Sequence, residues 1–102
     1  MSEMQVPAEV SRLAALVAQA VRELTGPSTR VLWYGSWIRG TAVPRSDVDL
    51  AVAGDRSIPP VVMARLRERI DELPTPRKID LVDIHAVGDA MRDRILSEGV
   101  AV

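Results

Sequence analysis

Short apolar segments alternate along the chain with segments that have the apolar spacing of amphipathic helices. This alternation limits the fold more than any other feature of the sequence. The apolar segments are rich in the residues that favour strands, and the helical ones repeat apolar residues every three or four positions. The predicted strands are 30–34, 46–53 and 78–84. The predicted helices are 7–25, 60–73 and 87–98.

Proline and glycine mark several ends of these elements. Pro7 suits a first helical turn, and Gly26 with Pro27 stops the helix that follows it. Gly35 ends the first strand, and Gly99 caps the last helix.

The length of 102 residues leaves room for one domain with one hydrophobic core, which we expect to span 1–102. The order of the elements predicts an α/β (α+β) fold. In this fold a small mixed three-stranded sheet has helices packed on it. Such an arrangement does not by itself identify a function.

Composition narrows the classes of function. A net charge of −1 gives no support for tight binding of nucleic acid. The lack of cysteine excludes disulfides, cysteine-bound zinc and a thiol nucleophile, and we expect a cytoplasmic protein. No apolar run reaches the roughly 18 residues needed to span a membrane. Glu3 and Arg12 interrupt the pattern of an export signal.

Asp47 and Asp49 form the first candidate site. Residues two apart on a strand point to the same face, with Cα atoms about 6.5 Å apart. Neighbouring carboxylates repel one another, and a divalent cation relieves the repulsion. Oxygen ligands of this kind suit Mg²⁺. The alternative is a solvated strand end.

Gly35 and Ser36 form the second candidate site, between a predicted strand and a short polar segment. Glycine lets the backbone approach a ligand closely, and backbone N–H groups with a serine hydroxyl can bind phosphate. Arg39, one turn further on, can add a guanidinium contact. The alternatives are a simple turn and a solvated arginine.

The two candidate sites together resemble a known signature. Gly-Ser, ten intervening residues and Asp-x-Asp resemble the signature of the DNA polymerase β superfamily of nucleotidyltransferases. Flanking residues look like those of the minimal nucleotidyltransferases of bacteria and archaea, and the resemblance covers nearly the whole chain. The flanking segments are 39–42, 46–51 and 97–100. Trp37 departs from the pattern, since many relatives carry a small or basic residue there.

The resemblance implies a third carboxylate on a later strand, where Asp80 and Asp83 are available. Positions three apart face opposite ways on a regular strand, so only one of them can join the first pair. We favour Asp80 and expect Asp83 to cap or to be solvated. The alternative for both is an exposed charge on an edge strand. His85 is expected to be a surface histidine, although a role as metal ligand or base stays open.

The chemistry implied by the resemblance is in-line transfer of a nucleoside monophosphate from an NTP, with ATP and AMP preferred, to an acceptor. Two Mg²⁺ ions bridge Asp47, Asp49 and the triphosphate. Gly35, Ser36 and Arg39 bind the nucleotide. Asp80 binds metal or acts as base.

The resemblance also implies a partner, because such proteins look like antitoxins that transfer AMP to a tyrosine of a HEPN ribonuclease. A chain this small leaves no residues for a domain that grips an acceptor, so we expect a protein acceptor or a second subunit. The alternatives are a binding module with weak or lost catalysis, and a structural domain with a fortuitous motif. The sequence leaves homo-oligomer formation open.

Overall fold

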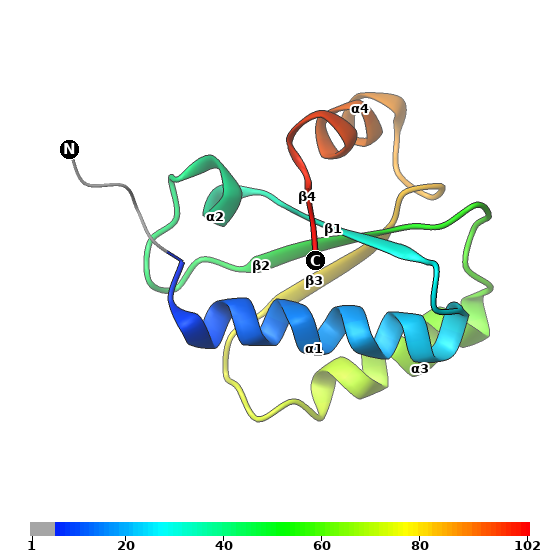
Figure 1. Ribbon diagram of the computed structural model, residues 1–102, viewed down its shortest axis with the longest axis horizontal. Coiled ribbons are helices and arrows are strands. Elements are labelled where there is room, and N and C mark those ends of the chain that lie inside the picture. Colours follow the sequence, from blue (N-terminus) through cyan, green and yellow to red (C-terminus); the bar gives the residue numbers. More distant parts are fainter. Residues whose placement is uncertain (1–5) are drawn as a thin grey trace.

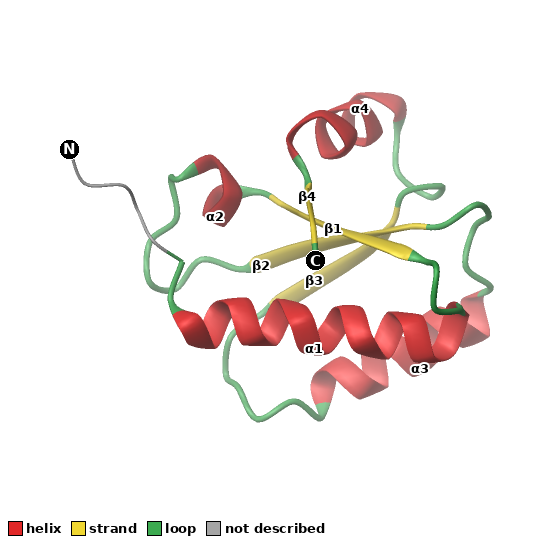
Figure 2. Cartoon of the chain, in the orientation of Figure 1, coloured by secondary structure: helices red, strands yellow, loops and turns green. Residues whose placement is uncertain are grey.

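The computed structural model describes residues 6–102, so the prediction that rests on Glu3 lies outside the described residues. Helices and strands alternate through most of the chain (Figure 2). The helices are α1 (Ala8–Thr25), α2 (Ser36–Arg39), α3 (Pro60–Asp71) and α4 (Asp89–Glu98). The strands are β1 (Arg30–Tyr34), β2 (Val48–Ala53), β3 (Ile79–Asp83) and β4 (Val100–Ala101).

The α/β class is confirmed, but the prediction of a three-stranded sheet is wrong. The described residues form a four-stranded sheet in the order β3-β2-β1-β4. β1 is antiparallel to β2 and to β4, whereas β2 and β3 are parallel, so the sheet is mixed as expected. No sequence pattern indicated β4, because this strand has 2 residues, too few for an alternating apolar pattern. Its pairing with β1 covers what would otherwise be an edge of the sheet.

Helices cover both faces of the sheet. α1 and α3 lie along one face, and α4 lies on the other (Figure 1). The larger core cluster lies under α1 and α3 and contains fully buried residues such as Val17, Leu50 and Leu66. A smaller cluster lies under α4, where Ile95 packs with Leu32 and Tyr34.

The alternation of side chains along β2 explains how the strand serves both the core and a site. Val48, Leu50 and Val52 are at most 1% exposed and belong to the larger core cluster. Because successive side chains on a strand point to opposite faces, Asp49 lies on the face of α4. The apolar side chains therefore fix the register that directs this carboxylate away from the larger core.

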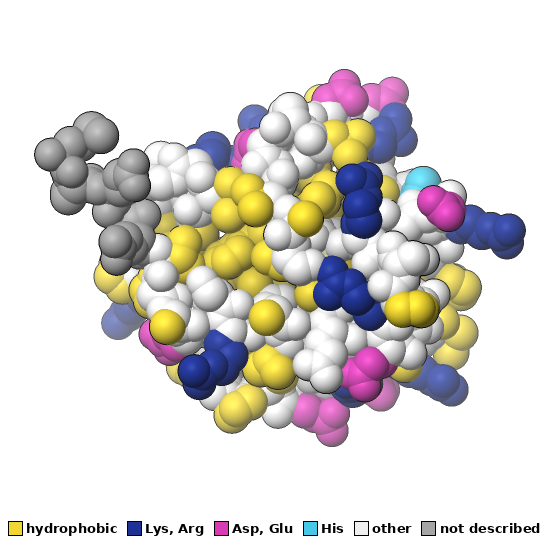
Figure 3. Space-filling model, in the orientation of Figure 1, with side chains coloured by type: hydrophobic (Ala, Val, Ile, Leu, Met, Phe, Trp, Pro, Cys, Tyr) yellow, Lys and Arg dark blue, Asp and Glu magenta, His cyan; other side chains and the backbone are white. Residues whose placement is uncertain are grey.

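The molecular surface carries mixed charge. On the face drawn in Figure 3, acidic and basic side chains are interspersed, and hydrophobic side chains gather between α1 and α4. Leu96 and Val100 are among the exposed large hydrophobic residues, at 51% and 50%. Within residues 6–102, no helix has the length and apolar character needed to cross a membrane.

Candidate active site

Tyr34, Asp49 and Asp80 form a row across three neighbouring strands. Tyr34 pairs with Asp49 between β1 and β2, and Asp49 pairs with Asp80 between β2 and β3. All three line a cavity of about 480 Å³ whose walls also include Gly35 and Arg39. The parallel pairing of β2 with β3 thus brings together two carboxylates that are far apart in the sequence.

The pKa of Asp49 is raised by its surroundings in the site. Its burial raises the pKa of the carboxyl, and the charges of Asp80 and Asp47 raise that pKa further. The cations of Arg39 and Lys78 act in the opposite direction, with smaller effects. The protein therefore compensates the charge of the ionised Asp49 only in part, which is the condition that favours binding of a cation.

Gly35 allows the Asp49 carboxylate to lie directly against the backbone of the first motif. The φ angle of Gly35 is 86°, a value that side-chain-bearing residues rarely adopt. A Cβ atom at this position would overlap Asp49 Oδ2 and would lie 3.0 Å from Asp49 Cγ. The Gly-Ser and Asp-x-Asp segments are thus in contact, and the missing side chain of Gly35 makes this contact possible.

Tyr34 lies beside Asp49 on the neighbouring strand and was not singled out from the sequence. Burial raises the pKa of Tyr34 to about 12, with further contributions from Asp49, Asp80 and Glu98. Its hydroxyl is buried and has no hydrogen-bond partner among the described residues. A neutral phenol therefore lines the cavity at physiological pH.

Glu98, at the end of α4, was also missed by the sequence reasoning. The Gly35 N–H donates to Glu98 Oε2 at 2.9 Å, and Arg39 Nη1 lies 3.2 Å from the same oxygen. This carboxylate joins the two ends of the short segment that carries Ser36. The contact spans 63 positions in the chain, so no local pattern could have predicted it.

Ser36 and Asp47 lie beside the cavity rather than among its lining residues. Ser36 is the first residue of α2, directly after Gly35. Asp47 is half-buried directly before β2, and its charge acts on Asp49. Among residues 6–102, no three acidic or histidine side chains form a group that could hold a metal ion. The metal role of Asp47, Asp49 and Asp80 therefore stays a prediction.

Asp83 and His85 lie outside this cavity. Asp83 is 5% exposed and accepts hydrogen bonds from the N–H groups of Ile58 and His85, at 2.6 and 2.9 Å. The imidazole of His85 lies 2.7 Å from the Gly54 carbonyl oxygen. Both residues therefore hold the loop that follows β2.

The comparisons with known proteins now identify the family. The family model described as "Polymerase beta, Nucleotidyltransferase" matches residues 28–102, a range that includes every predicted site residue. The chain belongs to this family. It is a nucleotidyltransferase, as the resemblance implied.

Relatives of this nucleotidyltransferase support the same assignment. The chain is 30% identical over 81 residues to the Haemophilus influenzae protein named "Probable protein adenylyltransferase MntA", covering 79% of this chain and 70% of the relative. A solved structure of a protein proposed to be a minimal nucleotidyltransferase is 26% identical, with a TM-score of 0.68 and full coverage of both chains.

A third similarity concerns the fold alone. It is to a chain in the structure of a tri-AMPylated Shewanella oneidensis HEPN toxin in complex with MNT antitoxin. The identity is 15% and the TM-score 0.65, covering 90% of this chain and 70% of that chain.

Proposed function

We propose that this nucleotidyltransferase uses Mg²⁺ to transfer AMP from ATP to a hydroxyl group of a protein, and that the acceptor is a HEPN-type protein. The observation that carries the proposal is the pairing of Asp49 with Asp80 in a cavity shared with Gly35 and Arg39. The choice of adenylate is supported by the name of the Haemophilus influenzae relative, a protein adenylyltransferase.

The acidic residues of the site fit a hard divalent cation. Asp49 has a raised pKa beside two further carboxylates, so a cation would relieve repulsion that the protein leaves in place. Mg²⁺ commonly uses only one or two carboxylates and completes its shell with phosphate oxygens and water. We assign Asp47, Asp49 and Asp80 as the residues that would hold two Mg²⁺ ions with the triphosphate. Bound there, Mg²⁺ supplies neutralisation of phosphate charge and a lower pKa for the attacking hydroxyl.

Ser36 and Arg39 provide the donors for the triphosphate. The Ser36 hydroxyl donates one hydrogen bond, and a guanidinium has five N–H donors. Glu98 engages one nitrogen of Arg39, so other N–H groups of this arginine remain for the β and γ phosphates. These contacts hold the leaving group in line with the attacking oxygen.

The transfer forms one bond and breaks one. The acceptor hydroxyl oxygen bonds to the α phosphorus while the bond from that phosphorus to the bridging oxygen of the β phosphate breaks. Pyrophosphate leaves with the bridging oxygen. The proton of the hydroxyl passes to Asp80, which is exposed, whereas Asp47 and Asp49 are half-buried.

A protein acceptor suits the outer wall of the cavity. Met91 and Arg94 of α4 line it, and both are exposed. Methionine and arginine are enriched where proteins meet. The structural neighbour that contains an AMPylated HEPN toxin supports the choice of acceptor. AMP on a HEPN nuclease would add bulk and negative charge where RNA phosphate must enter, so it would inhibit the nuclease.

The alternative is a binding module that inhibits a partner without modifying it. One observation fits this alternative as well: the exposed Met91 and Arg94 of α4 could contact a partner without any transfer. The two functions differ in whether the partner gains a covalent group.

Labelled ATP tests the proposed reaction. We expect a HEPN-type partner to gain label from ATP labelled at the α phosphate and none from ATP labelled at the γ phosphate. A chelator should abolish the transfer. Label transferred from the γ position would identify a kinase, and the absence of transfer from either position would contradict the proposal.

A further inference from the structure

The segment 40–47 joins the two halves of the motif, and none of its residues lies in a helix or strand. Ser36 comes before this segment, and Asp47 is its last residue. The position of the Asp47 carboxylate relative to the Ser36 hydroxyl therefore depends on how the segment is held. Turn hydrogen bonds between Val43 and Ser46 hold part of it. Two contacts from outside the segment hold the Ser46 carbonyl group, directly before Asp47.

Trp37 makes one of these contacts. Its indole Nε1–H donates to the Ser46 carbonyl oxygen at 3.2 Å. The ring is 6% exposed and packs in the larger core cluster, so it is a fixed donor. Trp37 directly follows Ser36, and Ser46 directly precedes Asp47. This hydrogen bond therefore connects the two halves of the motif.

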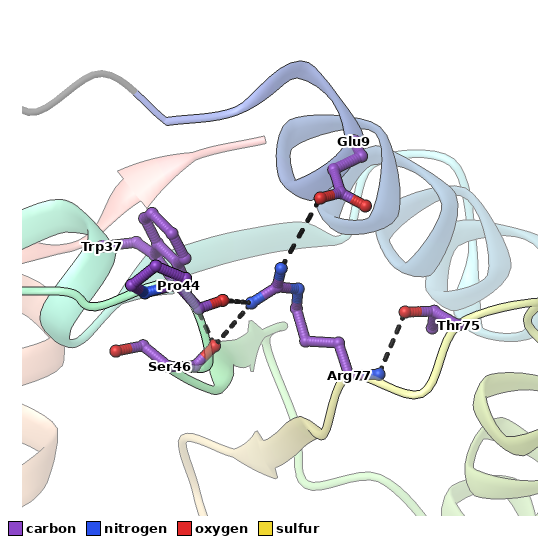
Figure 4. A network of polar contacts seen from close by, with 6 residues as sticks. All are labelled: Glu9, Trp37, Pro44, Ser46, Thr75 and Arg77. Atoms are coloured by element: carbon purple, nitrogen blue, oxygen red, sulfur yellow. Dashed lines mark hydrogen bonds and ion pairs between the residues drawn. The ribbon is translucent and has the colours of Figure 1, made fainter.

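Arg77 makes the other contact, from the turn before β3. Its Nη1 donates to the same Ser46 carbonyl oxygen at 3.2 Å and to the Pro44 carbonyl oxygen at 2.7 Å (Figure 4). The guanidinium carbon lies 5.6 Å from the centre of the Trp37 ring, within the range of a cation–π contact. The Arg77 side chain is 14% exposed, so most of it is shielded from solvent and its partners are defined.

Peptide planarity connects these contacts to Asp47. The Ser46 carbonyl belongs to the same planar unit as the nitrogen and Cα of Asp47. Two donors on that oxygen restrict the orientation of the plane, and with it the direction in which the Asp47 side chain leaves the backbone. The pairing of Val48 with β3 begins at the next residue, where the Val48 N–H donates to Lys78 O at 3.0 Å.

We propose that Trp37 and Arg77 are positioning residues, which hold the Ser46–Asp47 peptide and thereby set the Asp47 carboxylate against the phosphate-binding segment. The inference rests on the proposed function, since that function gives Asp47 and Ser36 their roles. It also explains the departure of Trp37 from the family pattern, because the indole N–H has a specific acceptor in this chain.

The test uses the full chain and substitutions that remove one donor each. Trp37→Phe keeps an aromatic ring in the core and removes the N–H. Arg77→Met removes the guanidinium, and Arg77→Lys restores the charge with fewer donors. Trp33→Phe is the matched control, because Trp33 is equally buried and its N–H has no partner among the described residues. Glu9→Gln is a second control, since Glu9 is 73% exposed and its ion pair with Arg77 is expected to contribute little.

Two readouts, compared with the Trp33→Phe control, separate positioning of Asp47 from a general effect on the core. We expect Trp37→Phe and Arg77→Met each to weaken calorimetric binding of Mg²⁺, in the presence of α,β-methylene-ATP, by about tenfold. We expect kcat to fall about tenfold as well, with little change in KM for ATP. The double variant should lose more than the sum of the two effects, because both donors share one acceptor. Arg77→Lys should recover part of the loss, and neither control should change either readout.

Two outcomes would overturn the inference, and they are distinguishable. If the double variant binds Mg²⁺ and turns over like Trp33→Phe, while Asp47→Asn is inactive, Trp37 and Arg77 do not position Asp47. If Asp47→Asn keeps wild-type activity, the proposed site itself is wrong, and the positioning role fails with it.

Discussion

At the scale of the residue, Gly35 shows how one missing side chain joins the two motifs. The positive φ and the closeness of Asp49 are separate demands, and only glycine meets both. The sequence predicted that the backbone at Gly35 would approach a ligand. The structure shows that it approaches Asp49, a contact that the spacing of the motif could not reveal. The approach to a ligand stays a prediction.

Gly35→Ala should therefore damage the site more than it damages the fold. Alanine at a positive φ costs about 1–3 kcal/mol of stability. This cost applies at position 35 and equally at position 40. Gly40→Ala is the control, because Gly40 has a φ of 78° and its Cβ would meet nothing within 4 Å. We expect comparable losses of stability in urea unfolding, and a fall in kcat/KM of about 100-fold in Gly35→Ala alone. Equal losses of activity would show that backbone strain, not the displacement of Asp49, is responsible.

Asp49→Asn should stabilise the metal-free protein at neutral pH. The folded-state pKa of Asp49 is raised above 3.8, so its contribution to stability is fully present below that pH and is lost as the pH rises through the folded-state pKa. Asparagine avoids this loss. Because Asp49 is half-buried, solvent screening keeps the gain to about 1 kcal/mol or less.

Urea unfolding with a chelator, at pH 7 and at pH 3, measures the effect. Asp55→Asn is the control, since Asp55 is exposed at the other end of β2. A gain of Asp49→Asn that persists at pH 3 would contradict the electrostatic explanation.

At the scale of the element, the alternation of side chains along β3 directs Asp80 and Asp83 to opposite faces of the sheet. Asp80 faces the cavity with Asp49, whereas Asp83 lies in register with Val52 and uses both carboxylate oxygens on backbone N–H groups. The strand period alone predicted that the two would diverge. Of the two roles expected for Asp83, the structure shows capping, and at 5% exposure the residue is not solvated. The strand period could not predict which N–H groups it accepts, because they belong to the loops that follow β2 and β3.

Substitution of Asp80 should impair turnover, whereas substitution of Asp83 should impair stability. Asp80→Asn should lower turnover by about 10²–10⁴-fold and leave stability nearly unchanged. Asp83→Asn should cost about 1–3 kcal/mol of stability, because an amide offers one acceptor oxygen where the structure uses two. Turnover numbers and urea midpoints of both variants measure this. Reversed effects would mean that Asp83, not Asp80, belongs to the site.

Element boundaries show where sequence patterns were sufficient. The predicted strand 30–34 is β1, and the other predicted strands and long helices agree with the observed ones to within about two residues. The apolar periodicity predicted the type of each element, and proline and glycine residues predicted several of the ends. β4 was missed because its two residues, Val100 and Ala101, are exposed and form a strand only by pairing with the edge of β1.

At the scale of the whole molecule, the candidate site draws on three strands and two helices. The sequence revealed the residues that belong to a local motif, with Asp80 added by the family resemblance. Tyr34, Glu98 and Arg77 escaped notice because their roles depend on contacts made by the folded chain. These residues contact the motif in the folded chain: Tyr34 lies near its carboxylates, Glu98 accepts from Gly35, and Arg77 donates to the Ser46 carbonyl oxygen.

We propose that this nucleotidyltransferase modifies a protein partner through its aspartate pair. Its most direct test is the intact mass of a HEPN-type partner after incubation with ATP, Mg²⁺ and either the wild type or the Asp47→Asn/Asp49→Asn double variant, together with the nuclease activity of the partner. We predict that the wild type adds AMP and inhibits the nuclease, and that the double variant does neither. If the double variant inhibits the nuclease equally well, and the partner gains no mass, binding rather than modification is the mechanism.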